Sequence, residues 1–407
     1  MRVGVIGAGP AGILAALSAA QHGAKVILFD SNSRAGKKLL LTGSGRCNLS
    51  NRNSVPQRYA CDDMRFLELA WKEFDQESLV NFLDSLGIST YATEDGWYYP
   101  QSNSAGNVVE ILNQLINAAE IKFQRATRIE RITPEGYGFK LIGENQTKPI
   151  YVDSLVIASG GKAYPQTGSD GNLNGAIRGL GHAVLPIRPA LAPMLLKAGV
   201  FDDLKGVRLD AACHLLFNRQ VIGRSVGNII FTEWGINGPG VMDLSYLVEN
   251  ANLAEFILEI DFLSENKEHA IALVEKAKTN GLPTRSAFLA ILPEKIVNWG
   301  FARAGLDFDE PAKGMTKNQL HGLLEQFSAT RAQVEGVKGY KYAQCSWGGV
   351  PAAEVDGSTM RSKKVAGLYF AGEVLNVVGP CGGYNLHWAF ASGWIAGRGA
   401  AKRESQD

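Results

Sequence analysis

The residues best suited to chemistry lie at the start of the chain, where three glycines separate an apolar run from a helical one. Arg2–Ile6 is typical of a buried parallel strand, and residues 13–20 have the composition of a helix. Between them, Gly7 would allow a tight turn, Gly9 would let the backbone approach a pyrophosphate, and Gly12 would let the helix pack closely on the strand. The N–H groups at the helix start would then face phosphate charge. This arrangement predicts a dinucleotide site.

A second strand supplies an acid at the expected place. Residues 25–29 are apolar, and Asp30 follows them, eighteen residues after Gly12. A carboxylate about 20 residues after the glycines accepts hydrogen bonds from ribose hydroxyls and disfavours a 2′-phosphate. We therefore expect FAD or NAD rather than NADP. The alternative is a glycine-rich turn before an ordinary helix, which leaves the position of the acid unexplained.

A basic, glycine-rich loop comes next. Lys37, Lys38 and Arg46 place positive charge where a diphosphate would lie. Gly43 and Gly45 would let the backbone come close to a flat ring. A nicotinamide enzyme normally continues with plain βαβ units here, so the loop favours FAD over NAD. On spacing alone, a solvated charged loop is the alternative.

Five segments make the sequence similar to a known family. They are GKKLLLTGSGRCN (36–48), VIASGGKAYPQTGSDG (156–171), FTEWGINGP (231–239), GLYFAGE (367–373) and GGYNL (382–386). With them the sequence resembles the BaiN-like (YhiN-type) NAD(P)/FAD-dependent oxidoreductases, flavoproteins of the glutathione-reductase-like FAD fold. The resemblance implies an α/β fold with a discontinuous, Rossmann-like FAD-binding domain and non-covalent FAD. It also suggests activated C=C bonds, such as those of enones, as acceptors.

The resemblance also implies roles within these segments. The strand that ends at Ala158 runs into Ser159–Gly161, where the chain can turn under the diphosphate. Glu373, after another buried strand, is implied to approach the ribityl-phosphate region. The helix that begins near Gly382 would direct N–H groups at the pyrimidine end of the flavin and so stabilise the reduced anion. Residues 126–128 are implied to pass near the adenine.

The predicted cofactor-binding residues are Gly7, Gly9, Pro10, Ala11, Gly12, Asp30, Ser31, Lys37, Lys38, Thr42, Gly43, Arg46, Cys47, Asn48, Ala126, Thr127, Ala158, Ser159, Gly160, Gly161, Gly372, Glu373, Gly383, Tyr384, Asn385 and Leu386. Asn376, Cys381 and His387 depart from the pattern of the family, and these differences bear on the substrate rather than the cofactor.

His387, Tyr384 and Cys381 are the catalytic candidates. His387 could donate a proton because imidazole titrates near neutrality, although a helix-face histidine held by hydrogen bonds is the favoured alternative. Cys381 could act as a redox thiol, but no second cysteine is nearby in the sequence, which disfavours a disulfide reductase. Tyr384 suits flavin contact better than acid–base work. No second GxGxxG follows a strand, so NAD(P)H, the expected reductant, would bind on the flavin surface.

The remaining sequence indicates an insertion. Residues 1–189 and 341–407 are assigned to the FAD-binding domain. Between them, residues 190–262 contain alternating, β-branched runs that predict a β-barrel-like domain, and residues 263–340 read as a helical subdomain. Within the first domain, helical spacing covers 64–88, residues 121–153 read as strands and a hairpin, and Asn103 is a candidate cap for a further helix.

Composition limits the class of protein. The chain has 407 residues, 45% of them hydrophobic, with 41 basic and 40 acidic side chains and a formal charge of +1. This balance excludes a generic polyanion binder but leaves room for a local basic groove. The five cysteines show no disulfide or zinc spacing, so we expect no metal and reduced thiols in a cytoplasm. The uncharged run from Val3 to Ala20 resembles a signal peptide in outline, but its glycines favour the strand–turn–helix reading, and no membrane span is expected.

Three functions remain open. The favoured one is an FAD-dependent oxidoreductase that passes hydride from NAD(P)H to an activated C=C bond of a small molecule. The second is a flavoenzyme that reduces uridine in RNA, where Arg34, Lys37, Lys38, Arg46 and Arg52 could contact either RNA or diphosphate. The third is a non-catalytic flavin-binding scaffold.

Overall fold

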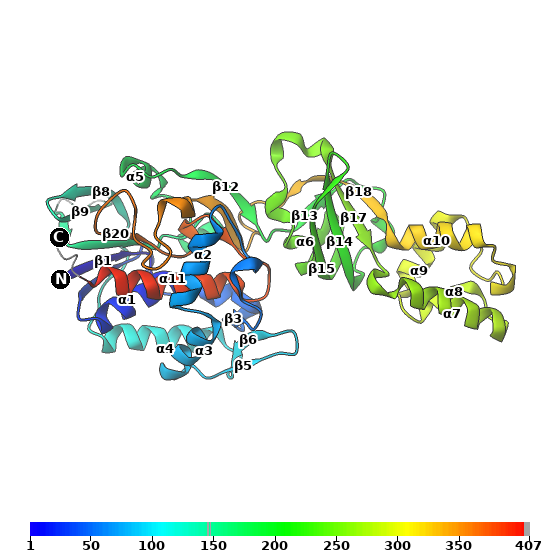
Figure 1. Cartoon of the computed structure of the whole chain (residues 1–407), viewed down its shortest axis with the longest axis horizontal. Helices are drawn as coiled ribbons and strands as arrows, with labels where there is room; N and C mark the ends of the chain where they lie inside the picture. The colour runs from blue at the N-terminus through cyan, green and yellow to red at the C-terminus, as the bar shows by residue number, and fades with distance from the viewer. Residues whose placement is uncertain (145, 147, 403–407) are drawn as a thin grey trace. The chain divides into compact units, whose positions relative to one another are not determined.

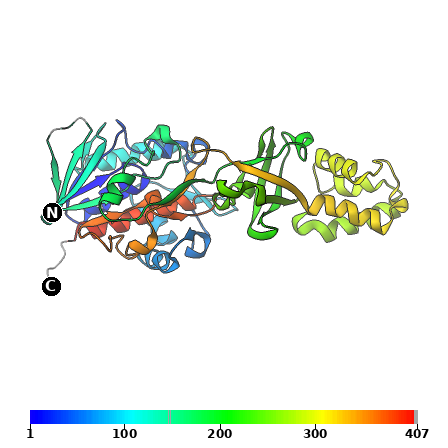
Figure 2. The ribbon, with the colours of Figure 1, turned by 90° about the horizontal axis from the view of Figure 1, so that it is seen from above.

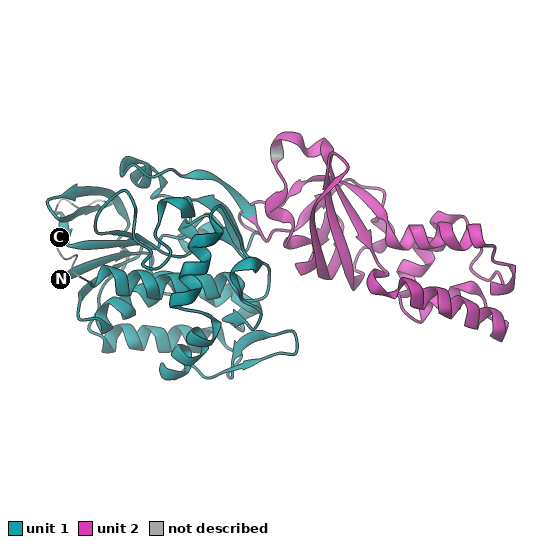
Figure 3. Ribbon diagram, in the orientation of Figure 1, with its two compact units in different colours: residues 1–189, 343–407 teal, residues 190–342 magenta. Residues whose placement is uncertain are grey.

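The structure is a computed structural model that describes residues 1–144, 146 and 148–402 (Figure 1; Figure 2). The chain divides into two compact units, Met1–Pro189 with Ala343–Asp407, and Ala190–Tyr342 (Figure 3). Each unit has its own buried hydrophobic core.

A five-stranded parallel sheet forms the centre of the first unit, in the order β20-β11-β1-β2-β7. Its strands are β1 (Arg2–Ile6), β2 (Lys25–Phe29), β7 (Lys122–Gln124), β11 (Ser154–Ile157) and β20 (Leu368–Phe370). Every residue of β11 and β20 is buried, as expected for a parallel sheet covered on both faces. This topology confirms the predicted α/β, Rossmann-like fold.

The first and last helices of the chain, α1 (Pro10–Gln21) and α11 (Tyr384–Ala400), pack against each other (Figure 1). Two glycines of α11 make the approach possible. A methyl group on Gly393 would overlap the backbone of Ala11, and one on Gly397 would overlap that of Ala15. The C-terminal segment is thus fixed beside the glycine-rich turn at the other end of the sequence.

Smaller elements surround this frame. Three strands form one small sheet, β3 (Ser50–Asn51), β6 (Trp97–Pro100) and β5 (Thr90–Ala92). The others are β4 (Ala60–Cys61), β8 (Ile129–Glu135), β9 (Gly138–Gly143), β10 (Ile150–Val152), β12 (Leu185–Ala190), β19 (Cys345–Gly349), β21 (Val377–Val378), α2 (Met64–Glu73), α3 (Gln76–Ser85), α4 (Ala105–Ala118) and α5 (Asn174–Gly179).

Two local expectations differ from the structure. The helical pattern over 64–88 is two helices, because the Asp75 carboxylate accepts a hydrogen bond from the Ser78 N–H and caps a new helix. The cap of α4 is Ser104 rather than Asn103, since the Ser104 hydroxyl accepts from the Asn107 N–H.

The second unit contains a closed antiparallel barrel, in the order β13-β16-β15-β14-β17-β18. Its strands are β13 (Met194–Leu196), β14 (Arg208–Phe217), β15 (Gln220–Thr232), β16 (Gly235–Asn237), β17 (Phe256–Asp261) and β18 (Thr330–Val337). Its helices are α6 (Pro239–Met242), α7 (Lys267–Asn280), α8 (Thr284–Leu289), α9 (Glu294–Ala304) and α10 (Lys317–Ser328). Residues 330–337, assigned above to the helical subdomain, instead form β18, which pairs with β17 and β13.

Candidate functional site

The glycine-rich turn between β1 and α1 leaves open space in front of a helix. Gly7 has φ +102°, and a methyl group there would overlap the carbonyl of Ala158, whereas one on Gly12 would overlap the carbonyl of Gly7. A methyl group on Gly9 would meet nothing within 4 Å. The helix begins after Gly9 with Pro10 in its first turn, and no side chain caps it. An uncapped helix start that faces open space fits a diphosphate.

Asp30, at the end of β2, faces the same turn. Its Oδ2 accepts from the N–H of Ala8 at 2.6 Å, and its Oδ1 accepts from the N–H of Asn32 at 2.7 Å. The Thr127 N–H donates to the Asp30 carbonyl at 2.7 Å, and the Ala126 N–H donates to the Asn32 carbonyl at 3.0 Å. The predicted ribose acid and the residues implied to pass the adenine are therefore neighbours.

The two lysines of the basic loop differ in their surroundings. Lys37 is exposed, and its Nζ donates to the Asn32 Oδ1 and the Gln166 carbonyl, both at 3.0 Å. Lys38 forms an ion pair of 2.6 Å with Glu373, with each side chain 20% exposed. Burial lowers the pKa of Lys38, but the Glu373 carboxylate, with smaller contributions from Cys345 and Tyr164, raises it, and the resulting pKa lies above its usual 10.5. The charge of Lys38 is thus neutralised within the protein.

Glu373 also joins the carboxyl ends of β11 and β20. Its Oε1 accepts from the Ser346 N–H at 2.9 Å. The Ser346 Oγ accepts from the N–H groups of Lys162 and Ala163, at 2.8 and 3.1 Å. A methyl group on Gly161 would lie 2.6 Å from the Glu373 Oε1 and 2.7 Å from the Ser346 Oγ. Sequence reasoning missed Ser346, because its partners are far away in the chain.

The segment after β11 lies against the dinucleotide turn. The Ser159 Cα would be 3.2 Å from a methyl group on Gly7, and Gly160 takes φ +76°. The next turn is close to the other side of the site, since a methyl group on Gly168 would lie 3.0 Å from the Ser31 Oγ. Gly372, with φ +77°, brings the end of β20 to Ala11, whose Cβ would be 2.8 Å from a methyl group on Gly372.

Arg46 is stacked on an aromatic ring. Its Cζ lies 4.4 Å from the centroid of Tyr99, and its Nη2 donates to the Tyr99 hydroxyl at 3.2 Å. Arg46 is exposed, whereas Tyr99 is buried. A methyl group on Gly43 would lie 3.2 Å from the Tyr99 Cε1, and the Thr42 hydroxyl donates to the Leu39 carbonyl. Tyr99 had no signal in the sequence beyond its position in an aromatic run.

The start of α11 packs on the segment that follows Arg46. Gly383 has φ +95°, and no side chain caps the helix. A methyl group on Gly383 would lie 2.5 Å from the side-chain amide of Asn48 and would overlap the Ser50 carbonyl. Asn385 braces the preceding loop, since its amide accepts from the Gly379 N–H at 2.9 Å and donates to the Gly379 carbonyl at 2.8 Å. Asn385 therefore shapes the loop through its side chain.

His387 and Tyr384 are both buried in α11. Burial lowers the pKa of His387 to about 3, and its Nδ1 lies 3.1 Å from the Ser50 Oγ. The expectation that His387 titrates near neutrality is therefore wrong. The alternative of a helix-face histidine held by hydrogen bonds is met at Nδ1 only, since the Nε2 is buried and has no hydrogen-bond partner among the described residues. The Tyr384 carbonyl accepts from the Tyr59 hydroxyl at 2.9 Å. The Leu386 side chain packs against the core.

None of the five cysteines, all of which lie in the described part of the chain, forms a disulfide, and Cys381 is only partly buried. Burial raises the pKa of Cys47, Cys61 and Cys213 to about 12 and that of Cys345 still further. Four of the five are thus unsuited to react as thiolates at neutral pH.

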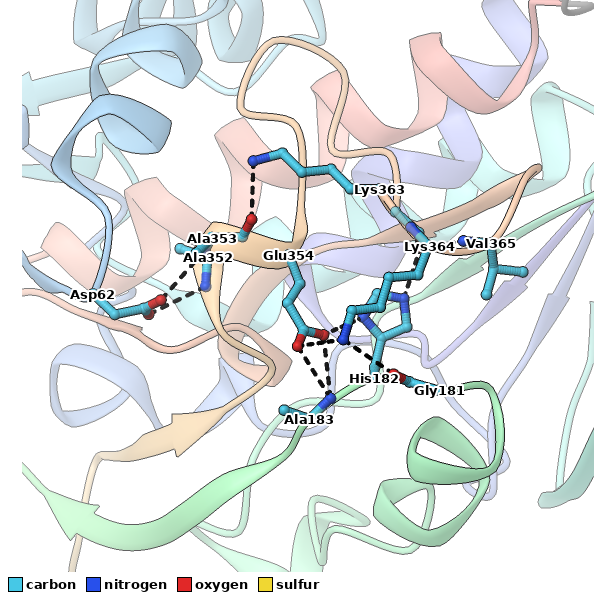
Figure 4. A network of polar contacts seen from close by, with 11 residues as sticks. Asp62, Gly181, His182, Ala183, Ala352, Ala353, Glu354, Lys363, Lys364 and Val365 are labelled. Carbon is cyan, nitrogen blue, oxygen red and sulfur yellow. Dashed lines mark hydrogen bonds and ion pairs between the residues drawn. The ribbon is translucent and has the colours of Figure 1, made fainter.

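A second polar cluster joins a serine, a histidine and an acid, and Figure 4 shows the histidine, His182, beside the acid, Glu354. The His182 Nδ1 lies 2.7 Å from the Glu354 Oε2, and its Nε2 lies 2.7 Å from the Ser362 Oγ. Ser362 is only 4% exposed, and its oxygen accepts from the N–H groups of Lys364 and Val365. Because the hydroxyl is buried and saturated, this cluster joins loops rather than attacking a substrate.

Comparison with known proteins decides the family. The model described as HI0933-like protein Rossmann domain matches residues 1–399. The chain belongs to the HI0933-like family. Among individual proteins, the chain is similar to the 3-dehydro-bile acid delta(4,6)-reductase of Clostridium scindens, with 34% identity over 99% of both chains. The ribosomal RNA dihydrouridine synthase of Escherichia coli is 28% identical over 96% of this chain and 95% of that one.

Solved structures agree on the fold of this HI0933-like protein. The 3-ketosteroid-delta4-(5alpha)-dehydrogenase from Rhodococcus jostii has a TM-score of 0.52 at 15% identity, covering 98% of this chain and 96% of the other. Together with the family and the reductase relative, these findings identify an FAD-dependent oxidoreductase. They give no support to a non-catalytic scaffold.

In the described part of the chain, no helix is long and apolar enough to cross a membrane. Among the same residues, no three or more His, Cys, Asp or Glu side chains are gathered so that they could hold a metal ion.

Proposed function

We propose that this HI0933-like protein binds FAD without a covalent bond, takes hydride from NAD(P)H and reduces the C=C bond of an α,β-unsaturated carbonyl compound. One observation supports the proposal most strongly: α1 and α11 both begin without a side-chain cap. The two helices pack tightly against each other, so both starts lie beside the same parallel sheet. Two such starts suit the diphosphate and the electron-rich end of a reduced flavin.

Different residues of the site bind the diphosphate, the ribose and the adenine of FAD. The backbone at Gly9–Gly12 receives the diphosphate, with Lys37 as the nearby cation. Asp30 binds the ribose hydroxyls with the acceptor sites that its backbone partners leave open. Ala126 and Thr127 flank the adenine.

The turn at Ala158–Gly161 passes under the diphosphate, beside Gly7. The flavin end is formed by three further groups of residues, which enclose the ring system and its ribityl chain. They are Thr42, Gly43, Cys47 and Asn48, then Gly372 with Glu373, and finally Gly383–Leu386. When bound, FAD supplies the hydride chemistry, and the protein supplies orientation and charge.

The acceptor class follows from the reductase relative, whose name gives a 3-dehydro-bile acid as its substrate. In the proposed reaction a hydride adds to the β-carbon, the C=C electron pair moves onto the carbonyl oxygen, and a proton from water completes the α-carbon. NAD(P)H is oxidised to NAD(P)⁺. With its pKa lowered to about 3 by burial, His387 is a neutral imidazole at pH 7 and offers no imidazolium proton, so the proposal takes water as the proton source.

Anaerobic stopped-flow spectroscopy tests this proposal in two steps. The holoprotein is first mixed with NADH or NADPH, and we expect loss of flavin absorbance near 450 nm, as is usual for oxidised flavins. The reduced protein is then mixed with cyclohex-2-enone or 4-androstene-3,17-dione, and we expect the absorbance to return. If neither donor bleaches the flavin, the proposal fails.

Reduction of uridine in RNA is the second candidate, and the 28% identity to ribosomal RNA dihydrouridine synthases favours it. The chemistry is the same, but the partner is a polynucleotide. Ribosomal RNA transcripts that reoxidise the reduced flavin and form dihydrouridine would support this candidate over the small molecule. Binding that weakens steeply with salt would accompany it.

A further inference from the structure

We propose that Arg46, held flat on Tyr99, binds the carbonyl oxygen of the acceptor and stabilises the enolate that forms there. From the sequence, Arg46 was expected to supply charge near the diphosphate and was also a candidate group near the flavin ring, but it had no assigned role in the reaction. The inference rests on the proposed function and deepens it, because it assigns a catalytic residue and requires an oxygen-bearing acceptor.

The path of the basic loop separates Arg46 from the diphosphate end of the site. The loop starts at that end, where the Gly36 N–H donates to the Ala8 carbonyl at 2.8 Å. It finishes at the other end, where Asn48 and Ser50 lie against Gly383 at the start of α11. Arg46 therefore belongs to the part of the loop beside α11.

Tyr99 fixes the guanidinium while leaving it available. The ring is 1% exposed and supports Arg46 by a cation–π contact of 4.4 Å and a hydrogen bond of 3.2 Å to its hydroxyl. Arg46 is itself exposed, and no carboxylate pairs with it among the salt bridges of the described residues. Lys38, in contrast, is neutralised by Glu373. Arg46 is thus an oriented cation with spare N–H donors.

Such a cation suits the charge that develops during reduction. As hydride reaches the β-carbon, the electron pair of the C=C bond becomes an enolate on oxygen, and a guanidinium can meet that oxygen with two parallel N–H groups. A donor placed where charge develops accelerates a reaction by about 10²–10³-fold. Tyr99 acts as a positioning residue, since it contacts Arg46 rather than the acceptor.

Arg46→Ala, Arg46→Lys and Tyr99→Leu test the assignment in the holoprotein, with Arg65→Ala as a control that removes another exposed positive charge from the first unit. The first readout is the dissociation constant of FAD, which we expect to change by less than about threefold. The second is the affinity for 4-chlorophenol, whose phenolate gives a long-wavelength absorbance when it stacks on oxidised flavin. We expect Arg46→Ala to weaken this affinity by about tenfold or more.

The third readout separates the two half-reactions. Bleaching by NAD(P)H should keep its wild-type rate in Arg46→Ala, while reoxidation by cyclohex-2-enone should slow by about 10²-fold. The reoxidation rate of Arg46→Lys should lie between those of the wild type and Arg46→Ala, and Tyr99→Leu should slow reoxidation less than Arg46→Ala does. Added guanidinium chloride should partly restore the reoxidation rate of Arg46→Ala. Arg65→Ala should match the wild type.

Two results would overturn the assignment. One is an Arg46→Ala variant that loses FAD affinity by tenfold or more but, at saturating FAD, is reoxidised at the wild-type rate. The other is unchanged affinity for 4-chlorophenol. If the wild type itself is not reoxidised by any enone, the proposed function fails, and the 4-chlorophenol affinity still decides whether Arg46 is an oxyanion site.

Discussion

Gly9→Ala should separate cofactor binding from folding. Gly9 has φ −77° and ψ −177°, which alanine adopts freely, and its added methyl group would meet nothing within 4 Å in the protein without ligand. Alanine gains about 0.4–1 kcal/mol because the unfolded chain is less free, and loses about as much because it is a poorer residue at a helix start. The free energy of unfolding of the apoprotein should therefore change by less than about 1 kcal/mol.

The same methyl group occupies the space proposed for the diphosphate. Forcing one extra carbon into a filled contact costs about 1–3 kcal/mol, which corresponds to about 5–150-fold weaker FAD binding. Gly7→Ala should behave differently. Its φ of +102° costs about 1–3 kcal/mol in any other residue, and its methyl group would also overlap the Ala158 carbonyl, so the apoprotein itself should lose stability.

Urea denaturation of the apoprotein and titration with FAD, followed by flavin fluorescence, measure the two effects. Gly322→Ala, in α10 of the other unit, is the matched control, because its methyl group also meets nothing within 4 Å. It should leave FAD binding unchanged. Wild-type FAD affinity in Gly9→Ala would refute the placement of the diphosphate in front of α1.

Three further predictions concern the frame of the site. Lys38→Met should lower the free energy of unfolding by about 1–3 kcal/mol, because it leaves Glu373 without its ion-pair partner. A double-mutant cycle with Glu373→Gln, measured by urea denaturation, should give a coupling energy above about 0.5 kcal/mol. Additive effects of the two substitutions would contradict the ion pair. The native pKa of His387 is about 3, whereas an unfolded histidine titrates near 6.5, so the stability that His387 contributes is present above pH 6.5 and is lost as the pH falls towards 3. Denaturation curves between pH 6.5 and 4 should show that this residue lowers the free energy of unfolding by up to about 1.4 kcal/mol for each pH unit. The free energy of unfolding of His387→Asn should depend less steeply on pH. An equal pH dependence in the two proteins would contradict burial of a neutral imidazole. Gly397→Ala should cost about 2 kcal/mol or more in thermal or urea unfolding, since its methyl group overlaps the Ala15 backbone, and an unchanged midpoint would mean that α1 and α11 are not in contact.

Some features depend on residues that are close in the sequence, and these could be predicted. The turn from Gly7 to Gly12 and the strand–helix–strand order around it require particular residue types at fixed spacing, because steric limits on the backbone act over a few residues. The family motifs are local in the same sense. For this reason the α/β fold, the FAD cofactor and the family were all available before any coordinates.

Other features depend on which distant residues meet, and only the tertiary structure decided them. Arg46 is a generic basic residue in its own loop and becomes an oriented cation only because β6 brings Tyr99 beneath it. Ser346 and Glu373 meet across the ends of strands far apart in the chain. Nothing in the sequence indicates that His387 is buried, yet packing against Ser50 and Trp71 removes it from water and keeps its imidazole neutral at pH 7.

The barrel shows the same division. Alternating runs in the sequence predicted its β character, but the last strand, Thr330–Val337, follows four helices and joins β17 and β13 only through pairing. The tendency of a segment to form a helix, a strand or a turn depends on its own residues and their neighbours, so it can be predicted from the sequence. The charge state of a side chain, its burial and the pairing of a strand depend on residues that are distant in the sequence, so only the tertiary structure shows them.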